Sequence, residues 1–172
     1  MMKIITVTDR LILREFSSKD ATHFYLLNLN TNVIKYTGDI AFSNVEEAKI
    51  FLDNYREYSL YHMGRWAVIE KSTNNFLGWC GLKFNSKTKY ADIGFRFFEE
   101  YWNRGFATES SKACIKYGFE KLNLNTIIGR AMQQNTASIR VLEKIGLCFE
   151  KEIEFDACNK GVVYKIEKEI SQ

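Results

Sequence analysis

The sequence predicts an α/β fold built around a mixed β-sheet. Three β-rich runs between residues 66 and 98 are separated by polar turn clusters, as in an antiparallel meander. Residues 107–122 then place apolar side chains on one helical stripe and charged side chains outside it. Strand-like and helix-like segments alternate to the end of the chain, so helices packed on a mixed sheet are expected.

The N-terminal third predicts one strand and two helices. Residues 11–13 are an apolar run typical of a first strand. Ser17 followed by Asp20 resembles a capping box and predicts a helix start. Ser43 followed by Glu46 repeats this pattern, and apolar residues recur behind it at helical spacing.

The third run of the meander has one apolar and one polar face. Its apolar side chains alternate with polar ones, as expected for a half-buried strand. The three runs are 66–69, 76–84 and 90–98, and the apolar positions of the third are Ala91, Ile93, Phe95 and Phe97.

The C-terminal half predicts two helices and three further strands. A helix at residues 107–122 is expected to pack on the sheet, and Gly146 is expected to stop a later helix. The remaining predicted segments are a strand at 126–131, a helix at 135–145, and closing strands at 149–155 and 162–170.

Composition limits the classes of function. A length of 172 residues without a linker-like segment fits a single domain spanning residues 1–172. The 24 Lys and Arg against 21 Asp and Glu leave a formal charge of +3, which is too small and scattered to predict nucleic-acid binding. The first residues lack the pattern of a signal peptide and no apolar stretch approaches a membrane span, so a cytoplasmic protein without membrane contact is expected.

The cysteines and histidines do not predict a metal site. No Cys-x-x-Cys pair is present, and two histidines are too few to complete a zinc site among scattered thiols. In the cytoplasm the thiols are expected to stay reduced and to pack as small buried hydrophobic groups. The residues concerned are Cys80, Cys114, Cys148, Cys158, His23 and His62.

Residues 101–108 form a glycine-containing turn that leads directly into the helix predicted at 107–122. Free N–H groups and the positive end of the dipole make a helix N-terminus suitable for anions, and Gly105 allows close approach of a ligand to the backbone. The segment has neither the three glycines of a dinucleotide fingerprint nor the Gly-Lys-Ser/Thr of a P-loop. It predicts either a different phosphate site or a glycine that simply permits a turn.

Four short segments together resemble the GNAT superfamily of N-acetyltransferases. They are residues 92–95, 105–107, 135–138 and 144–146. Within the superfamily the chain is most similar to the RimJ/RimL-like branch of ribosomal-protein N-acetyltransferases. The resemblance runs from residues 10–14 to the last strands, so it covers nearly the whole chain in the correct order.

The resemblance implies a fold and an activity. The expected fold has a largely antiparallel central sheet of roughly six to seven strands flanked by about four helices, with two strands splayed to form the acetyl-CoA cleft. The implied enzyme moves an acetyl group from acetyl-CoA to a protein N-terminal amine or a small-molecule amine by direct attack in a ternary complex. The alternatives are a non-catalytic acyl-CoA-binding module and a ping-pong enzyme that uses Cys80 or Cys114 as nucleophile.

The resemblance also implies which residues bind acetyl-CoA. Backbone amides of the glycine turn would hold the pyrophosphate, and strand backbone would bind the pantetheine arm like an added strand. Asn135 would lie beside the pantetheine, although it could equally cap its helix. The implied residues are Phe95, Phe97, Arg104, Gly105, Phe106, Ala107, Thr108 and Asn135.

Two residues are candidates for proton transfer. Asp92 stands where relatives carry Glu and would act as general base through water, unless it is a solvated strand residue. Many members place a thiolate acid seven residues after the Asn, where this chain has Leu142. Ser138 is the substitute that the resemblance implies, unless its hydroxyl only satisfies the first helical turn.

The acceptor amine and the oligomeric state are left open. Protein N-termini, polyamines, aminoglycosides and amino acids are all acceptors within the superfamily, and homodimers are frequent in it. Three aromatic residues could wall the acceptor pocket or belong to the core. They are Tyr36, Trp66 and Trp79.

Overall fold

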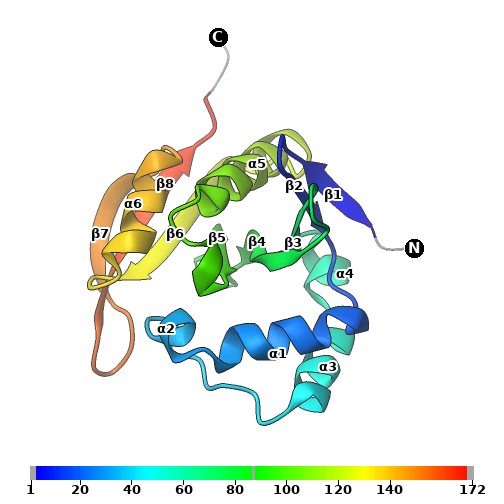
Figure 1. Cartoon of the computed structure of the whole chain (residues 1–172). Helices are drawn as coiled ribbons and strands as arrows, with labels where there is room; N and C mark the ends of the chain where they lie inside the picture. The colour runs from blue at the N-terminus through cyan, green and yellow to red at the C-terminus, as the bar shows by residue number, and fades with distance from the viewer. Residues whose placement is uncertain (1–2, 87, 170–172) are drawn as a thin grey trace.

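A single twisted sheet organises the chain (Figure 1). The computed structural model describes residues 3–86 and 88–169, and within them eight strands follow the order β1-β2-β3-β4-β5-β6-β8-β7. Neighbouring strands are antiparallel except for the parallel pair β5 and β6. The strands are β1 (Ile4–Val7), β2 (Leu11–Arg14), β3 (Arg65–Glu70), β4 (Phe76–Phe84), β5 (Ala91–Phe97), β6 (Thr126–Met132), β7 (Cys148–Glu154) and β8 (Lys160–Glu167).

Six α-helices and two short 3-10 turns connect these strands in the described ranges. None of the helices there combines the length and the apolar composition needed to cross a bilayer. The helical segments are η1 (Ser18–Asp20), α1 (Ala21–Leu29), α2 (Thr31–Ile34), α3 (Val45–Asp53), α4 (Glu57–Tyr61), η2 (Glu99–Tyr101), α5 (Phe106–Glu120) and α6 (Thr136–Lys144).

The predicted mixed α/β architecture is confirmed, with additions at short elements. The sheet has one strand more than expected, because β1 pairs with β2 as an edge strand. The four expected helices are present as α1, α3, α5 and α6. Helices α2 and α4 were not predicted, because segments of four and five residues are too short to show a helical period.

The predicted N-terminal cap is present before α1, but the cap of α3 differs from the prediction. Ser17 and Asp20 form the predicted capping box. At α3 the capping residue is Asn44 rather than Ser43, because the Asn44 side chain accepts a hydrogen bond from the Glu47 N–H at 2.9 Å. Helix α6 ends at Lys144, and Gly146, predicted to stop it, follows with a φ of 93° that favours glycine.

Helices cover both faces of the sheet (Figure 1). Helix α5 packs on one face, together with the apolar side chains of β5 and the buried Leu142 of α6. Helices α1 and α3 lie on the opposite face, which we call the α1 face. Trp66 is fully buried under α5 and contacts Tyr117 edge to face, so for this residue the core alternative is confirmed and the acceptor-pocket alternative is not.

The cysteines separate into two buried and two exposed thiols. Cys80 and Cys114 are fully buried and their Sγ atoms lie 3.6 Å apart, which confirms packing as small hydrophobic groups for this pair. Burial raises the pKa of the Cys114 thiol. Cys148 and Cys158 are exposed, so the same prediction is wrong for them, because both lie on or near the poorly covered edge strand β7.

Thiol labelling should distinguish these classes. In the native protein at mildly alkaline pH, a maleimide is expected to modify Cys148 and Cys158 rapidly, and Cys80 and Cys114 only after unfolding. Peptide mass spectrometry of the labelled protein identifies the sites, and denatured protein provides the fully labelled control. Rapid native labelling of Cys80 would contradict its burial and reopen the ping-pong alternative.

Candidate active site

Strands β5 and β6 separate partway along their length. Their parallel pairing ends at Ile93 and Gly129, although β5 continues to Phe97 and β6 to Met132. Beyond this point each strand remains paired only on its outer side, to β4 or β8. The facing edges therefore carry backbone N–H and C=O groups without a strand partner. This wedge is the splayed strand pair that the family resemblance implied.

The turn before α5 leaves several backbone donors free. Gly105 is the N-cap, has a φ of 81°, and supplies no side-chain cap. The first helical hydrogen bond runs from the Glu109 N–H to the Gly105 carbonyl at 3.0 Å. In the described structure no acceptor is present for the N–H groups from Gly105 to Thr108. Together with the helix dipole, these four donors form an anion site.

Two arginines add positive charge to this turn. The Arg10 guanidinium donates to the Arg104 carbonyl at 3.1 Å and lies 4.4 Å from the centroid of the Phe106 ring. Arg104 is half exposed and lies 5.0 Å from the same ring. Sequence reasoning missed Arg10 as part of the site, because it reaches the turn from 94 residues away and no local pattern marks it.

An ion pair fixes Arg10 against the first turns of α5. Glu109 accepts hydrogen bonds from the Thr8 hydroxyl at 2.6 Å and from the Arg10 side chain at 2.7 Å. Partial burial raises the pKa of Glu109, but these hydrogen bonds outweigh it and leave the pKa below its ordinary value. The carboxylate thus holds Arg10 at and above neutral pH, and this support is lost on strong acidification.

The predicted pantetheine-binding residues line the wedge with backbone. Phe95 packs against the core and Phe97 is buried in it, so only their peptide groups face the opening. Because β5 and β6 are parallel, their carboxyl ends share one edge of the sheet, and Gly105 and Asn135 follow these ends. Asn135 caps α6 by accepting from the Ser138 N–H at 3.1 Å, which confirms the capping interpretation, and its side-chain N–H groups have no acceptor among the described residues.

Asp92 is buried and paired with a cation. The residue is 6% exposed on the α1 face, and Arg130 of β6 donates to its Oδ2 from Nε at 2.7 Å and from Nη2 at 2.6 Å. The interpretation of Asp92 as a solvated strand residue is therefore wrong. Its Oδ1 has no partner within the described chain. The half-buried Ser138 likewise has a hydroxyl without a hydrogen-bond partner among those residues.

The segment around α2 is fastened across the end of β5. Glu99 accepts hydrogen bonds from the Asn30 and Asn32 side chains at 3.2 and 3.1 Å. Arg96 of β5 forms an ion pair with Asp39, in the segment that follows α2. These contacts hold residues 30–39 beside the wedge on the α1 face (Figure 1).

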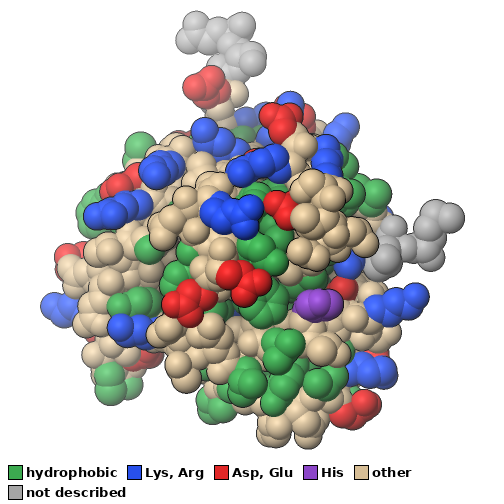
Figure 2. Space-filling view, in the orientation of Figure 1, with side chains coloured by type: hydrophobic (Ala, Val, Ile, Leu, Met, Phe, Trp, Pro, Cys, Tyr) green, Lys and Arg blue, Asp and Glu red, His purple; other side chains and the backbone are tan. Residues whose placement is uncertain are grey.

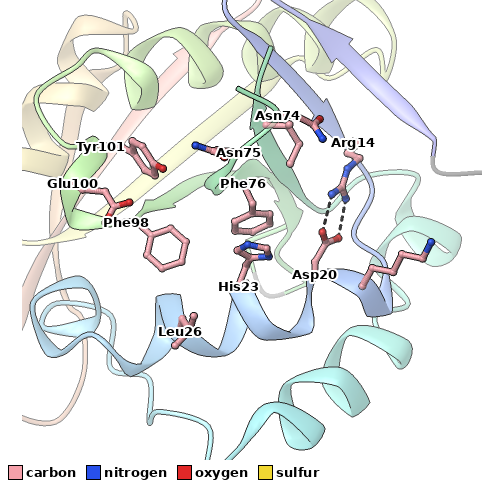
Figure 3. A pocket seen from close by; sticks show the side chains of 12 residues that line it. Arg14, Asp20, His23, Leu26, Asn74, Asn75, Phe76, Phe98, Glu100 and Tyr101 are labelled. Atoms are coloured by element: carbon pink, nitrogen blue, oxygen red, sulfur yellow. Dashed lines mark hydrogen bonds and ion pairs between the residues drawn. The ribbon is translucent and has the colours of Figure 1, made fainter. Parts of the chain in front are cut away.

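A separate hollow opens on the α1 face beside the turn that precedes α5 (Figure 2). It has a volume of about 550 Å³, and His23 stacks on Phe76 in it with ring centroids 5.3 Å apart (Figure 3). None of its lining residues comes from β6, α6 or residues 102–105, so the hollow adjoins the wedge without being part of it. The lining residues are Arg14, Lys19, Asp20, His23, Leu26, Ile69, Asn74, Asn75, Phe76, Phe98, Glu100 and Tyr101.

No cluster of three or more His, Cys, Asp or Glu side chains that could hold a metal occurs in residues 3–86 and 88–169. The described residues place backbone N–H groups, arginines, Asp92, Asn135 and Ser138 at the wedge. These groups can bind a diphosphate, hydrogen-bond an extended amide chain and exchange protons.

Comparisons with known proteins assign this arrangement to a family. Residues 10–147 match the acetyltransferase (GNAT) domain family. An uncharacterised N-acetyltransferase of Bacillus licheniformis, p20, is 33% identical over 84% of this chain and 82% of its own length. The crystal structure of a GNAT-family acetyltransferase from Bacillus anthracis has a TM-score of 0.82 at 27% identity, covering 97% of this chain and 98% of that one.

A ribosomal acetyltransferase shares the fold at lower identity. The RimL ribosomal L7/L12 α-N-protein acetyltransferase has a TM-score of 0.83 at 16% identity, covering 98% of this chain and 96% of that one. At this identity the likeness concerns the fold alone. The match over residues 10–147 and the 33% identical relative show that the chain belongs to the acetyltransferase (GNAT) domain family, whose members are acetyl-CoA-dependent acyltransferases.

Proposed function

We propose that this protein transfers the acetyl group of acetyl-CoA to a primary amine by direct attack in a ternary complex. The acceptor is a protein N-terminal amine or a small-molecule amine. The observation that carries the proposal is the set of free N–H groups from Gly105 to Thr108 at the carboxyl end of the splayed strand β5. A diphosphate and an extended amide chain are the ligands that such a turn and such an open strand edge accept.

The pyrophosphate, the pantetheine arm and the thioester of acetyl-CoA each have a partner in this proposal. The pyrophosphate binds the amides of residues 104–108, with Arg10 and Arg104 supplying charge. The pantetheine arm extends along the open edge of β5 at Phe95 and Phe97, and the free Asn135 side-chain N–H groups bind it from the α6 side. A strand N–H of β5 then polarises the thioester carbonyl.

Asp92 and Ser138 are the proposed groups for proton transfer. The amine must lose a proton to attack, and the free Oδ1 of Asp92 can accept it through a water. The departing thiolate is stabilised by a donor, and the unpartnered Ser138 hydroxyl lies in the first turn of α6. Arg130 binds only Oδ2, so the ion pair and the proton transfer use different oxygens.

Several broader expectations belong to the same proposal. A single domain spanning residues 1–172 acts in the cytoplasm, without nucleic acid, membrane or metal, as a member of the RimJ/RimL-like branch. A homodimer is compatible with it, and light scattering measures the oligomeric state. Trp79 and Tyr36 remain candidates for the acceptor pocket, because Trp79 lies on the α1 face and Tyr36 within residues 30–39.

Single-turnover acetyl transfer tests the proposal. Enzyme, acetyl-CoA and a panel of primary amines are mixed, and free thiol release and acetylated product are followed together. Acetyl transfer is expected only when an amine is present. No acetylated enzyme should form when the amine is left out. Acetyl-enzyme formed without an amine would indicate a ping-pong route, and coenzyme A binding without transfer to any amine would indicate a binding module.

A further inference from the structure

A cation lies directly against β5 where the wedge begins. Arg65 is the first residue of β3, and across the sheet Gly81 and Gly94 are register partners on the same face. A Cβ added at Gly94 would lie 2.6 Å from the Arg65 Cζ and Nη2 atoms. The guanidinium therefore packs flat on Gly94, one residue beyond the last β5–β6 pair at Ile93.

The Arg65 side chain is held in one orientation. Its Nη1 donates to the Gly81 carbonyl at 2.5 Å and to the Asp92 carbonyl at 2.7 Å. Its main-chain N–H donates to the Tyr55 hydroxyl at 2.8 Å, and the Tyr58 hydroxyl donates to its carbonyl. Both ends of the residue are thus fixed by hydrogen bonds to groups on other elements.

The charge of Arg65 has no acidic partner. Arg96 pairs with Asp39 and Arg130 pairs with Asp92 on the same face, but no carboxylate of the described residues lies within ion-pair distance of Arg65. Its Nε and Nη2 atoms also have no hydrogen-bond partner there. Unlike the sealed Nε of Arg96, neither of these two atoms is fully buried. Two donors and a net positive charge are therefore accessible from outside.

The two free nitrogens form one edge of the guanidinium. Nε–H and Nη2–H point the same way, and this pair matches the two oxygens of a carboxylate. Trp79 lies between the cations, with its ring centroid 5.4 Å from Arg65 and 5.1 Å from Arg96. The ring thus separates the Arg65 guanidinium from that of Arg96, which is paired with Asp39.

We propose that the Arg65 edge binds the carboxylate of the acceptor, so that the acceptor is an amino acid or a similarly small amine that carries a carboxylate. This inference rests on the proposed function. The thioester is expected one to three residues along β5 from Gly94, which corresponds to roughly 3–10 Å. An amine and a carboxylate on one small molecule span that distance. Polyamines would place positive charge against an unpaired guanidinium and are disfavoured.

Paired acceptors test the proposal in the intact enzyme. For alanine and phenylalanine, kcat/KM is compared with that of the corresponding α-carboxamide, which keeps the amine and removes the negative charge. The wild type is expected to prefer the free acid by about 10- to 100-fold, as for loss of a charge-assisted hydrogen-bond pair. Spermidine and a peptide with a free N-terminus complete the panel.

The variant Arg65→Gln should reduce this preference to about threefold or less, mainly through KM for the acid. Arg56→Gln is the matched control, because Arg56 is exposed at the start of α4 and forms no ion pair with any residue that the structure describes. If Arg65→Gln does not fold, the wild-type ratio still tests the acceptor class, because an enzyme that does not prefer the free acid overturns the proposal.

The possible outcomes are distinct. A wild-type enzyme that acetylates amines without preferring the acid, or that prefers spermidine, overturns the Arg65 proposal and leaves the proposed function standing. A preference that survives in Arg65→Gln also overturns it, because the carboxylate then binds elsewhere. Failure to acetylate any amine overturns the proposed function itself.

Discussion

Replacing Gly105 by valine is expected to weaken acetyl-CoA binding at least about 100-fold. Gly105 has a φ of 81°, which a β-branched residue adopts only at a cost of about 1–3 kcal/mol. The backbone is therefore expected to rotate, and the N–H groups from Gly105 to Thr108 then lose their common direction. Each charge-assisted hydrogen bond lost to the pyrophosphate contributes to the lower affinity.

Isothermal calorimetry with coenzyme A measures the affinity, and Gly146→Val provides the control. Gly146 is also exposed and has a φ of 93°, but it lies just after α6 and not in the turn before α5. Both variants should lose similar stability in thermal unfolding, and only Gly105→Val should lose affinity. Normal coenzyme A binding by Gly105→Val would show that the pyrophosphate does not bind this turn.

The predictable parts of this site are those encoded in a short stretch of sequence. Gly105 and the apolar alternation of β5 are local patterns, and the structure places both as predicted. The splay of β5 from β6 was known only through the family resemblance, since no residue between 91 and 97 signals where pairing with a distant strand ends. The glycine turn could thus be predicted from the local sequence, whereas the separation of β5 from β6 could be predicted only from the family resemblance.

The electrostatics of the site were not predictable from the sequence. Asp92 meets Arg130 from a strand 38 residues away, and Arg10 meets Glu109 across 99 residues. Arg65 is singled out only because Gly94, two strands away on β5, leaves room for its guanidinium. Pairings of this kind depend on strand order and register, which side-chain periodicity alone does not determine.

Replacing Asp92 by asparagine is expected to lower kcat by about 100-fold or more, with KM for acetyl-CoA nearly unchanged. The amide keeps the size of the side chain but cannot accept the proton of the attacking amine. Stopped-flow or steady-state thiol release at saturating acceptor measures kcat. Ser138→Ala should instead lower kcat less.

Arg130→Gln separates the catalytic role of Asp92 from its role as an ion-pair partner. This variant leaves the buried carboxylate without its cation and should cost about 1–3 kcal/mol of stability, toward the lower end because the Arg130 side chain is 41% exposed. If Asp92 only anchors Arg130, both variants should reduce kcat equally. If Oδ1 takes the proton, Asp92→Asn should be far slower than Arg130→Gln, since Arg130 contacts only Oδ2. A fully active Asp92→Asn enzyme would transfer the role of base to a water chain along β5.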